Sequence, residues 1–467
     1  MSSLMIRKSV YTVAITGLSI FSLSAQKSHK PNLVLFMADD CSHYDIGCYG
    51  SVDSKTPHID NFASEGMRFT KAYEAAPMSS PTRHNLLTGL WPVKTGAYPN
   101  HTMAREGTLS IVQHLKPAGY KVALIGKSHV APSSVFDWDL YVDTSKGGDL
   151  NFDAIDNFIS ECRSEGTPFC LFVMSRQPHT PWNKGNPSQF NPEKIKLPPF
   201  YVDIPETREK FCDYLAEINY MDAEFGKLLK ILDEKKVRDN SAVVFLSEQG
   251  NSLPFAKWTL YEPGVKSACI VRWPGVVQSS TTSDAIVEYV DILPTFLEMA
   301  GAKAQGELDG KSFLGVLTNK KTEHKQYTFS IHTTRGIFGG SEYFGIRAVA
   351  DKKYRYIVNL TPEMTFQNTE TAGKLFKRWK EVAENDPFAA MITHRYQHRP
   401  AIELYDIEND SYCMENIADL PENASIVKRM DQVLKQWMKA CGDEGQPTEM
   451  KATEHQFRNS RGQIGEE

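Results

Sequence analysis

The chain has 467 residues, 41% hydrophobic and 23% charged, with a formal net charge of −5. This length is enough for two domains with a large core, and the composition excludes a low-complexity chain. The mildly acidic balance and the absence of a basic run exclude nucleic acid as an expected partner. If the substrate is an anion, local cations must therefore hold it.

The N-terminus has the pattern of an export signal. Arg7 and Lys8 precede an apolar run at residues 10–23, which is shorter than the roughly 20 residues that span a bilayer. The run ends in Ser24-Ala25, a small-residue pair typical of a cleavage site. We therefore expect residues 1–25 to be a signal peptide, the mature protein to be periplasmic, and no stable membrane anchor. A single N-terminal anchor is the alternative.

The first strand of the mature chain is predicted at residues 32–38, a nearly continuous apolar run typical of a strand buried on both faces. It runs directly into Asp39 and Asp40. Two adjacent carboxylates at the end of a buried strand are costly unless a cation or basic groups meet them. Hard cations such as calcium and magnesium take such ligands. The alternative is a helix-capping Asp beside a loop Asp.

Residues 77–89 contain the pattern Ser-x-Pro-x-Arg, with Ser79 first and Arg83 last. Proline is favoured in the first turn of a helix, so Ser79 and Ser80 are predicted at a helix N-terminus, where backbone N–H groups attract anions. Arg83 follows one turn later and can point to the same place. The pattern fits an anion site with an adjacent serine, or an ordinary serine-capped helix.

Three more apolar runs, at residues 120–126, 169–174 and 241–246, alternate with helical patterns such as residues 207–236. This alternation predicts a large, mostly parallel α/β sheet. Polar side chains follow each run, and the carboxyl ends of parallel strands meet at the ligand-binding edge of such sheets. We therefore expect one site to contain the residues Asp39, Asp40, Ser79, Arg83, Lys127, His129, His179, Glu248, Gln249 and Lys257.

A catalytic domain is predicted to end near residue 325. Short strand-like segments and a helix at residues 426–441 predict a smaller α+β domain over residues 326–467, with a loosely held tail from Gly442. This domain is expected to complete the substrate pocket. Its candidate substrate-binding residues, for each of which a solvated surface position is the alternative, are His332, Arg335, His394, Arg395, His398 and Arg399.

The motif from Ser79 to Gly89 resembles the signature of the formylglycine-dependent sulfatases in the alkaline phosphatase superfamily, and the resemblance spans about residues 31–434. Residues 308–312 and 403–406 resemble later landmarks of that family. Residues 126–132 and 254–264 are similar to the N-sulfoglucosamine sulfohydrolases, or heparan sulfamidases. The resemblance implies an alkaline phosphatase-like fold and a sulfatase activity.

The resemblance also implies roles for individual residues. Ser79 would be oxidised to formylglycine by a radical-type maturation enzyme, because the position is Ser and not Cys. One hydroxyl of the formylglycine hydrate would attack sulfur, and the other would then expel sulfate. The Ca²⁺ ligands would be Asp39, Asp40, Glu248 and Gln249. The groups holding sulfate would be Arg83, Lys127, His179 and Lys257, and His129 would assist elimination.

Two residues depart from the family pattern. Glu248 occupies a position where the family commonly has Asp, and Lys257 one where sulfamidases can carry Arg, which would bind in a bidentate manner. The second departure weakens the assignment to N-sulfate.

The leading hypothesis is an exported sulfatase acting on a sulfated saccharide, N-sulfoglucosamine from heparin or heparan sulfate. The alternatives are an O-sulfatase, for example 6-O, on another glycan, and a non-catalytic sulfated-glycan-binding protein if Ser79 is unmodified. A phosphatase or phosphodiesterase of the same superfamily would more often use zinc, and the sequence lacks a His-rich ligand set.

Overall fold

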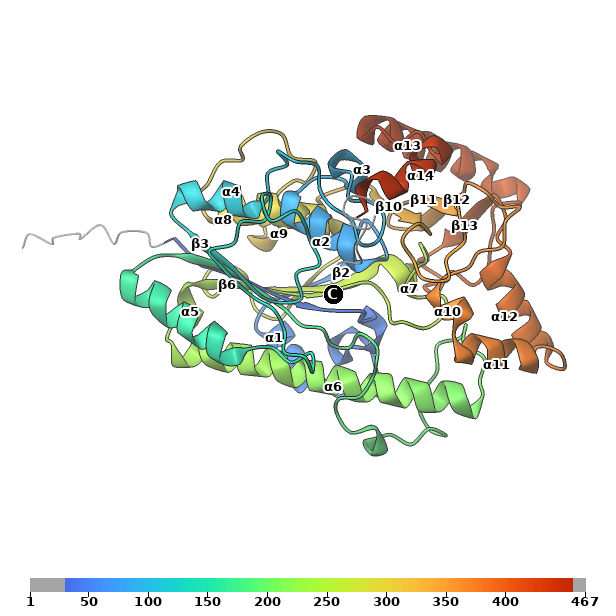
Figure 1. Ribbon diagram of the computed structural model, residues 1–467, viewed down its shortest axis with the longest axis horizontal. Coiled ribbons are helices and arrows are strands. Elements are labelled where there is room, and N and C mark those ends of the chain that lie inside the picture. Colours follow the sequence, from blue (N-terminus) through green and yellow to red (C-terminus); the bar gives the residue numbers. More distant parts are fainter. Residues whose placement is uncertain (1–29, 457–467) are drawn as a thin grey trace, which may run out of the picture.

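The computed structural model describes residues 30–456, so the expected signal peptide lies outside the described residues. Its largest element is a nine-stranded sheet (Figure 1). The order across this sheet is β4 (Leu140–Val142), β3 (Lys121–Gly126), β5 (Phe169–Met174), β1 (Asn32–Ala38), β6 (Ser241–Ser247), β7 (Lys266–Arg272), β2 (Met67–Tyr73) and β8 (Thr281–Ser283), with β9 (Val287–Glu288) pairing with β2.

Both faces of this sheet are buried, which explains the unbroken apolar runs in its strands. In β1, Val34 and Phe36 belong to the core on one face, whereas Leu33 and Leu35 belong to the core on the other. One face is covered by α1 (Pro57–Ser64), α5 (Phe152–Glu165) and α6 (Pro205–Glu234), and the opposite face by α2 (Ser79–Thr88), α4 (Ile111–Leu115), α8 (Ile292–Met299) and α9 (Leu314–Leu317) (Figure 1).

The strands from β4 to β6 run parallel, while β7 is antiparallel to both of its neighbours. The predicted α/β class with a mostly parallel sheet is therefore confirmed. Because β3, β5, β1 and β6 are consecutive in the sheet, their carboxyl ends form one continuous edge. Two short helices, α3 (Pro92–Thr95) and α7 (Glu262–Val265), lie in the connections.

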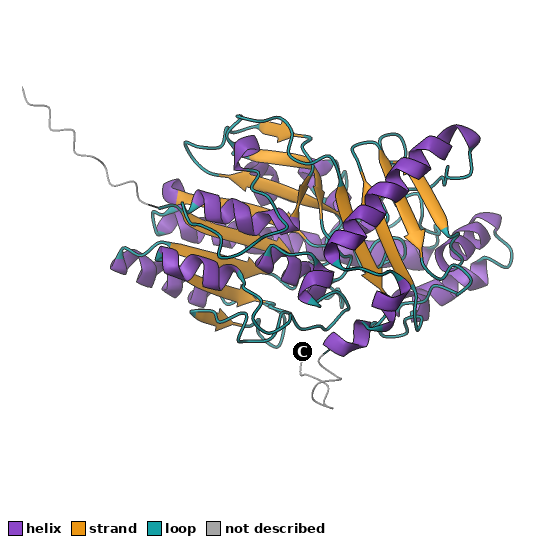
Figure 2. Ribbon diagram, turned by 90° about the horizontal axis from the view of Figure 1, so that it is seen from above, coloured by secondary structure: helices purple, strands orange, loops and turns teal. Residues whose placement is uncertain are grey.

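A second, antiparallel sheet forms the smaller domain and stands apart from the large sheet when seen from above (Figure 2). Its strands, in order, are β10 (Thr328–Thr333), β11 (Gly345–Ala350), β12 (Tyr354–Asn359) and β13 (Ile402–Asp406). One face packs on α13 (Ala424–Cys441). The other face belongs to the same core as α6 of the large domain and as α11 (Lys374–Val382) and α12 (Pro387–Gln397), so the two domains have a continuous apolar contact. The short helix α10 (Thr369–Ala372) precedes α11 and has no buried residues.

The expectation of a loose tail from Gly442 is wrong as far as Gln456. This segment contains α14 (Gln446–Met450), and its Asp443 and Glu449 reach the buried guanidinium of Arg347 in β11. Further along, the backbone of His455 accepts hydrogen bonds from Thr102 and Met103 of the catalytic domain. Charged residues that looked solvated in the sequence are therefore partners of a buried arginine distant in the chain. We call residues 443–456 the C-terminal strap.

Within residues 30–456, no helix is both long and apolar enough to cross a membrane. The longest helix, α6, buries one side and carries charged residues on the other. All eight cysteines have free thiols.

Asp443→Ala is expected to lower the free energy of unfolding by about 3–5 kcal/mol, because it leaves Arg347 buried without its main partner. Denaturant unfolding of the full chain measures the change. Glu234→Ala, which removes an exposed i,i+4 pair with Lys230, is the control and should change stability by less than about 1 kcal/mol. Equal effects of the two substitutions would contradict a stabilising role for the strap.

Candidate active site

Four neighbouring parallel strands deliver the predicted residues to one edge of the large sheet. Asp39 and Asp40 follow β1, Lys127 and His129 follow β3, His179 follows β5, and Glu248 and Gln249 follow β6. The register pairs Ala38 with Ser247, so the next residues, Asp39 and Glu248, leave the sheet side by side. Ser79 and Arg83 come from the first turns of α2, all of whose residues are buried.

Asp39 and Asp40 both face this edge because of an unusual backbone conformation. Successive side chains in a strand point to opposite faces. Asp40, however, has a φ of 60°, in the left-handed region that few residues other than glycine adopt. This turn brings both carboxylates to one place, where oxygen atoms of Asp39, Asp40 and Glu248 lie within 4.8 Å of one another.

The hydroxyl of Ser79 lies between two of these acids. Its Oγ is 2.9 Å from Asp39 Oδ1 and 2.8 Å from Glu248 Oε2, and the side chain of Lys127 approaches it to 3.3 Å. A hydroxyl has one proton, so it cannot donate to two ionised carboxylates at once. Burial, reinforced by the Asp39 charge and only partly offset by Arg83, raises the pKa of Glu248 to about 8, so this carboxyl holds a proton near neutral pH.

Three buried cations compensate the acids. Arg83 donates from Nε to Glu248 Oε1 at 2.9 Å, Lys127 lies 2.6 Å from Asp39 Oδ2, and Lys257 lies 2.7 Å from Asp40 Oδ2. Burial alone would raise the pKa of Asp39, but Lys127, with Glu248, His179 and Arg83, holds it well below its usual range. The pKa of Asp40 is lowered in the same way, chiefly by Lys257 against the cost of burial.

The acidic cluster fits a divalent cation. Gln249 donates from Nε2 to Asp40 Oδ1 at 2.7 Å, but its Oε1 is buried and has no hydrogen-bond partner within residues 30–456. Two carboxylates, a third from Glu248 once it has lost its proton, and a spare amide oxygen are the donor set that calcium or magnesium prefers. A cation bound here would be held by Asp39, Asp40, Glu248 and Gln249.

His129 contacts a histidine that sequence reasoning missed. Its Nε2 lies 3.1 Å from Nδ1 of His101, while its own Nδ1 is buried without a hydrogen-bond partner in the described part of the chain. Burial, with Lys127, His101 and Arg83, lowers the pKa of His129 well below its usual value. The imidazole is therefore neutral, and its contact with His101 requires that one of the two facing nitrogens carries a proton and the other does not. Only the fold brings the two together, since no spacing pattern relates them.

His179 borders the mouth of the cluster. Its side chain is 35% exposed, and Nε2 lies 3.6 Å from Asp40 Oδ2. Ser252, a second residue that the sequence did not single out, donates to the same oxygen at 2.7 Å. Asp40 thus holds His179, Lys257 and Ser252 around one oxygen atom.

The six candidates of the smaller domain are separated. His332 and Arg399 are buried in that domain, and Arg335 is half-buried over the ring of Tyr343. Arg395 packs on aromatic rings and donates to the backbone oxygen of Cys413. His394 and His398 are exposed on α12 and contact each other. No described contact joins these six to the acidic cluster, so their roles stay predictions.

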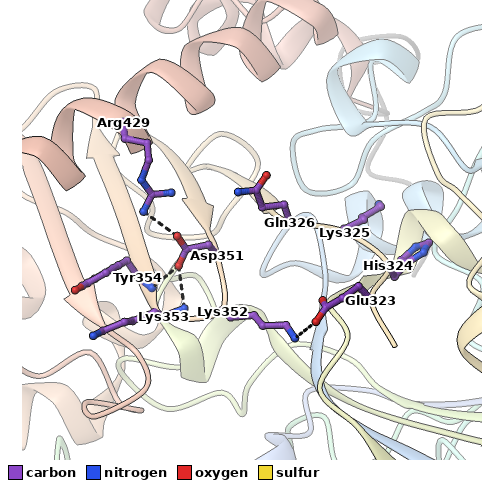
Figure 3. Close-up of a pocket in the computed structure, with 9 residues that line it drawn as sticks. All are labelled: Glu323, His324, Lys325, Gln326, Asp351, Lys352, Lys353, Tyr354 and Arg429. Atoms are coloured by element: carbon purple, nitrogen blue, oxygen red, sulfur yellow. Dashed lines mark hydrogen bonds and ion pairs between the residues drawn. The ribbon is translucent and has the colours of Figure 1, made fainter. Parts of the chain in front are cut away.

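A cavity of about 500 Å³ lies elsewhere, where the turn between β11 and β12 meets α13 (Figure 3). Its cations are already paired: Lys352 with Glu323, Arg429 with Asp351, and Lys325 with Glu288 and Asp291. It contains none of the residues predicted for catalysis, so the sheet edge stays the candidate active site.

Comparison with known proteins agrees with this geometry. The Sulfatase family profile matches residues 31–302, more than half of the chain. The chain belongs to the sulfatase family. A second profile, "N-sulphoglucosamine sulphohydrolase, C-terminal", matches residues 250–370 of this sulfatase. The predicted family and enzyme class, a sulfuric ester hydrolase, are thereby confirmed.

Curated relatives of the sulfatase include an ulvan-active sulfatase from Formosa agariphila, 32% identical, with 92% of this chain and 84% of the relative covered. The human N-sulphoglucosamine sulphohydrolase is 24% identical, with 88% and 90% covered. A solved structure described as a complex with "its substrate D-Glucosamine-2-N, 6-O-disulfate" has a TM-score of 0.71 at 20% identity, covering 89% of this sulfatase and 99% of that chain. This structural likeness confirms the fold.

Calcium is expected to raise the melting temperature of the sulfatase, because a ligand that binds only the folded state stabilises it by about 2.7 kcal/mol at 100 times its Kd. Asp40→Asn should lose most of this shift, measured within each variant as calcium against EDTA. Asp45→Asn, which alters a buried acid outside the cluster, should keep it. A full calcium shift in Asp40→Asn would disprove the metal site.

His101→Ala is expected to lower kcat by about 10- to 100-fold with little change in KM, because the His129 ring would lose the hydrogen-bonded contact that orients it. His101 has a φ of 52°, which asparagine tolerates. His101→Asn should therefore restore part of kcat. A rise in KM at constant kcat would instead place His101 in substrate binding.

Proposed function

We propose that this protein is an exported, periplasmic sulfatase that removes sulfate from glucosamine residues of heparin or heparan sulfate. The observation that carries the proposal is the enclosure of the Ser79 Oγ by Asp39, Glu248 and Lys127, next to two further cations. The sugar class is supported by the N-sulphoglucosamine sulphohydrolase profile over residues 250–370, which include Lys257 and β10 to β12.

Ser79 is proposed to be converted to formylglycine by a radical-type maturation enzyme before export. Formylglycine supplies, as its hydrate, two hydroxyls on one carbon where a serine has one. A divalent cation at the acidic cluster supplies Lewis-acid polarisation of a sulfate oxygen. Formylglycine would lie at the N-terminus of α2, which favours an anion beside it, and the cation would lie at the acidic cluster of Asp39, Asp40 and Glu248.

The remaining groups have separate tasks. Arg83 and Lys127 flank the reacting side chain and stabilise negative charge on the sulfate oxygens. Lys257 and His179 both reach Asp40 Oδ2 and lie where the leaving oxygen or nitrogen needs a proton. Neutral His129 can accept a proton through the one of its ring nitrogens that carries none.

A second candidate is an O-sulfatase acting on another glycan, such as ulvan. It is favoured by the 32% identity to an ulvan-active sulfatase. It is also favoured by Lys257, whose compact ammonium group lacks the bidentate fork of an arginine.

Mass spectrometry and sulfate release test the proposal together. Protein produced with the maturation enzyme should yield a peptide whose mass is lower by two hydrogens, with the change on Ser79 and not on Ser80. The same protein should release sulfate from N-sulfated glucosamine faster than from the 6-O-sulfated sugar or ulvan oligosaccharides, and Ser79→Ala should release none. Faster release from either O-sulfated substrate favours the second candidate, and an unmodified, inactive protein overturns both.

A further inference from the structure

Arg399 and His332 of the smaller domain are buried, and several of their nitrogen atoms lack a hydrogen-bond partner. Arg399 is 2% exposed and His332 is fully buried. Within residues 30–456, neither terminal nitrogen of Arg399 and neither ring nitrogen of His332 has a hydrogen-bond partner. A buried donor left unsatisfied is costly, and more so when charged, so the two Arg399 nitrogens and the single ring N–H of His332 are an expensive arrangement in the absence of a ligand.

The two side chains belong to one cluster. The Arg399 guanidinium lies 3.9 Å from the centre of the Phe366 ring, and the His332 ring packs 5.9 Å from the same ring. Burial, together with the charge of Arg399, lowers the pKa of His332 well below its usual value. Nε of Arg399 donates to the backbone of Tyr396 at 3.3 Å, which fixes the base of the guanidinium and leaves its two terminal nitrogens available.

This cluster adjoins the active site through the segment that leads into Ser79. Ile331, next to His332 in β10, donates from its backbone to Ala75 at 2.8 Å. Trp258, next to Lys257, donates from its backbone to Pro77 at 3.3 Å. The side chain of Trp258 in turn interacts with Glu370. The neighbours of His332 and of Lys257 in the chain therefore both contact the segment Ala75–Pro77 that leads into Ser79.

We propose that Arg399 and His332 form a second anion subsite beside the sulfate site, which binds an additional sulfate or carboxylate on the substrate. The two free nitrogens of a guanidinium match the spacing of two oxygens in either group. The positive charge of the Arg399 guanidinium favours an anion over a cation as the ligand. The reacting residue Ser79 is itself only 4% exposed, so the burial of Arg399 and His332 is no argument against contact with the substrate.

The inference rests on the proposed function and narrows it to substrates with two acidic groups. Wild-type protein should act faster on D-glucosamine 2-N,6-O-disulfate, or on a uronate-containing N-sulfated disaccharide, than on glucosamine N-sulfate. Comparison of the two doubly charged substrates decides whether the second group is sulfate or carboxylate. Arg399→Met should lower kcat/KM for the preferred substrate by roughly 10- to 100-fold and lower that for glucosamine N-sulfate by a much smaller factor.

Arg378→Met is the matched control, because it removes the same charge from an exposed arginine of α11 that already pairs with Glu206 and Glu381. It should leave both rates unchanged. Equal losses on singly and doubly charged substrates in Arg399→Met, or no loss, would overturn the subsite.

A measurement without turnover separates this inference from the proposed function. Inorganic sulfate should raise the melting temperature of Ser79→Ala, and the rise should be smaller when Arg399→Met is added but not when Arg378→Met is added. The same rise in all three proteins would overturn the subsite even if the enzyme is active. A selective loss with Arg399→Met would support it even if none of the sugars above is the substrate.

Discussion

The charges buried at the carboxyl edge of the large sheet depend on one another. Asp39, Asp40 and Glu248 would be too costly to bury alone, and so would Arg83, Lys127 and Lys257. Fully ionised, the three acids and three cations balance, and a proton on Glu248, whose pKa burial raises to about 8, leaves the cluster with an excess positive charge. The parallel strands, the left-handed turn at Asp40 and the buried start of α2 all serve to hold these six groups within hydrogen-bond distance. An anion that enters, or a cation that binds, changes this balance.

Much of this arrangement could be predicted from the sequence, because strands buried on both faces are read as unbroken apolar runs. The polar residues directly after them, such as Asp39, Lys127 and Glu248, then meet at one edge for topological reasons. Lys257 was harder, since it lies in a loop beyond β6; its position after the strand placed it at the same edge, but only the resemblance to a known family gave it a role in holding sulfate. The contact of His101 with His129 had no sequence signal, because neither spacing nor residue type relates the two loops.

The smaller domain was predicted less well, for a different physical reason. Its strands β10 to β12 were expected, but α11 and α12 were not, since their charged residues obscure the few apolar positions that they bury. The strap was wrongly expected to be loosely held, because the sequence does not show that Asp443 and Glu449 form ion pairs with the buried Arg347. Charge pairs between distant segments cannot be recognised from one sequence, whereas buried apolar runs can.

The contacts of the strap also determine when, during synthesis, the loop that carries His101 can become ordered. The loop that carries His101 is held through Thr102 and Met103 by the backbone of His455, and through Asn100 by the side chain of Gln456. These partners lie more than 350 residues after the loop in the chain, so its contacts with them form only once the strap has been synthesised and has folded back. The order of the loop beside His129 therefore depends on a segment that is made long after it.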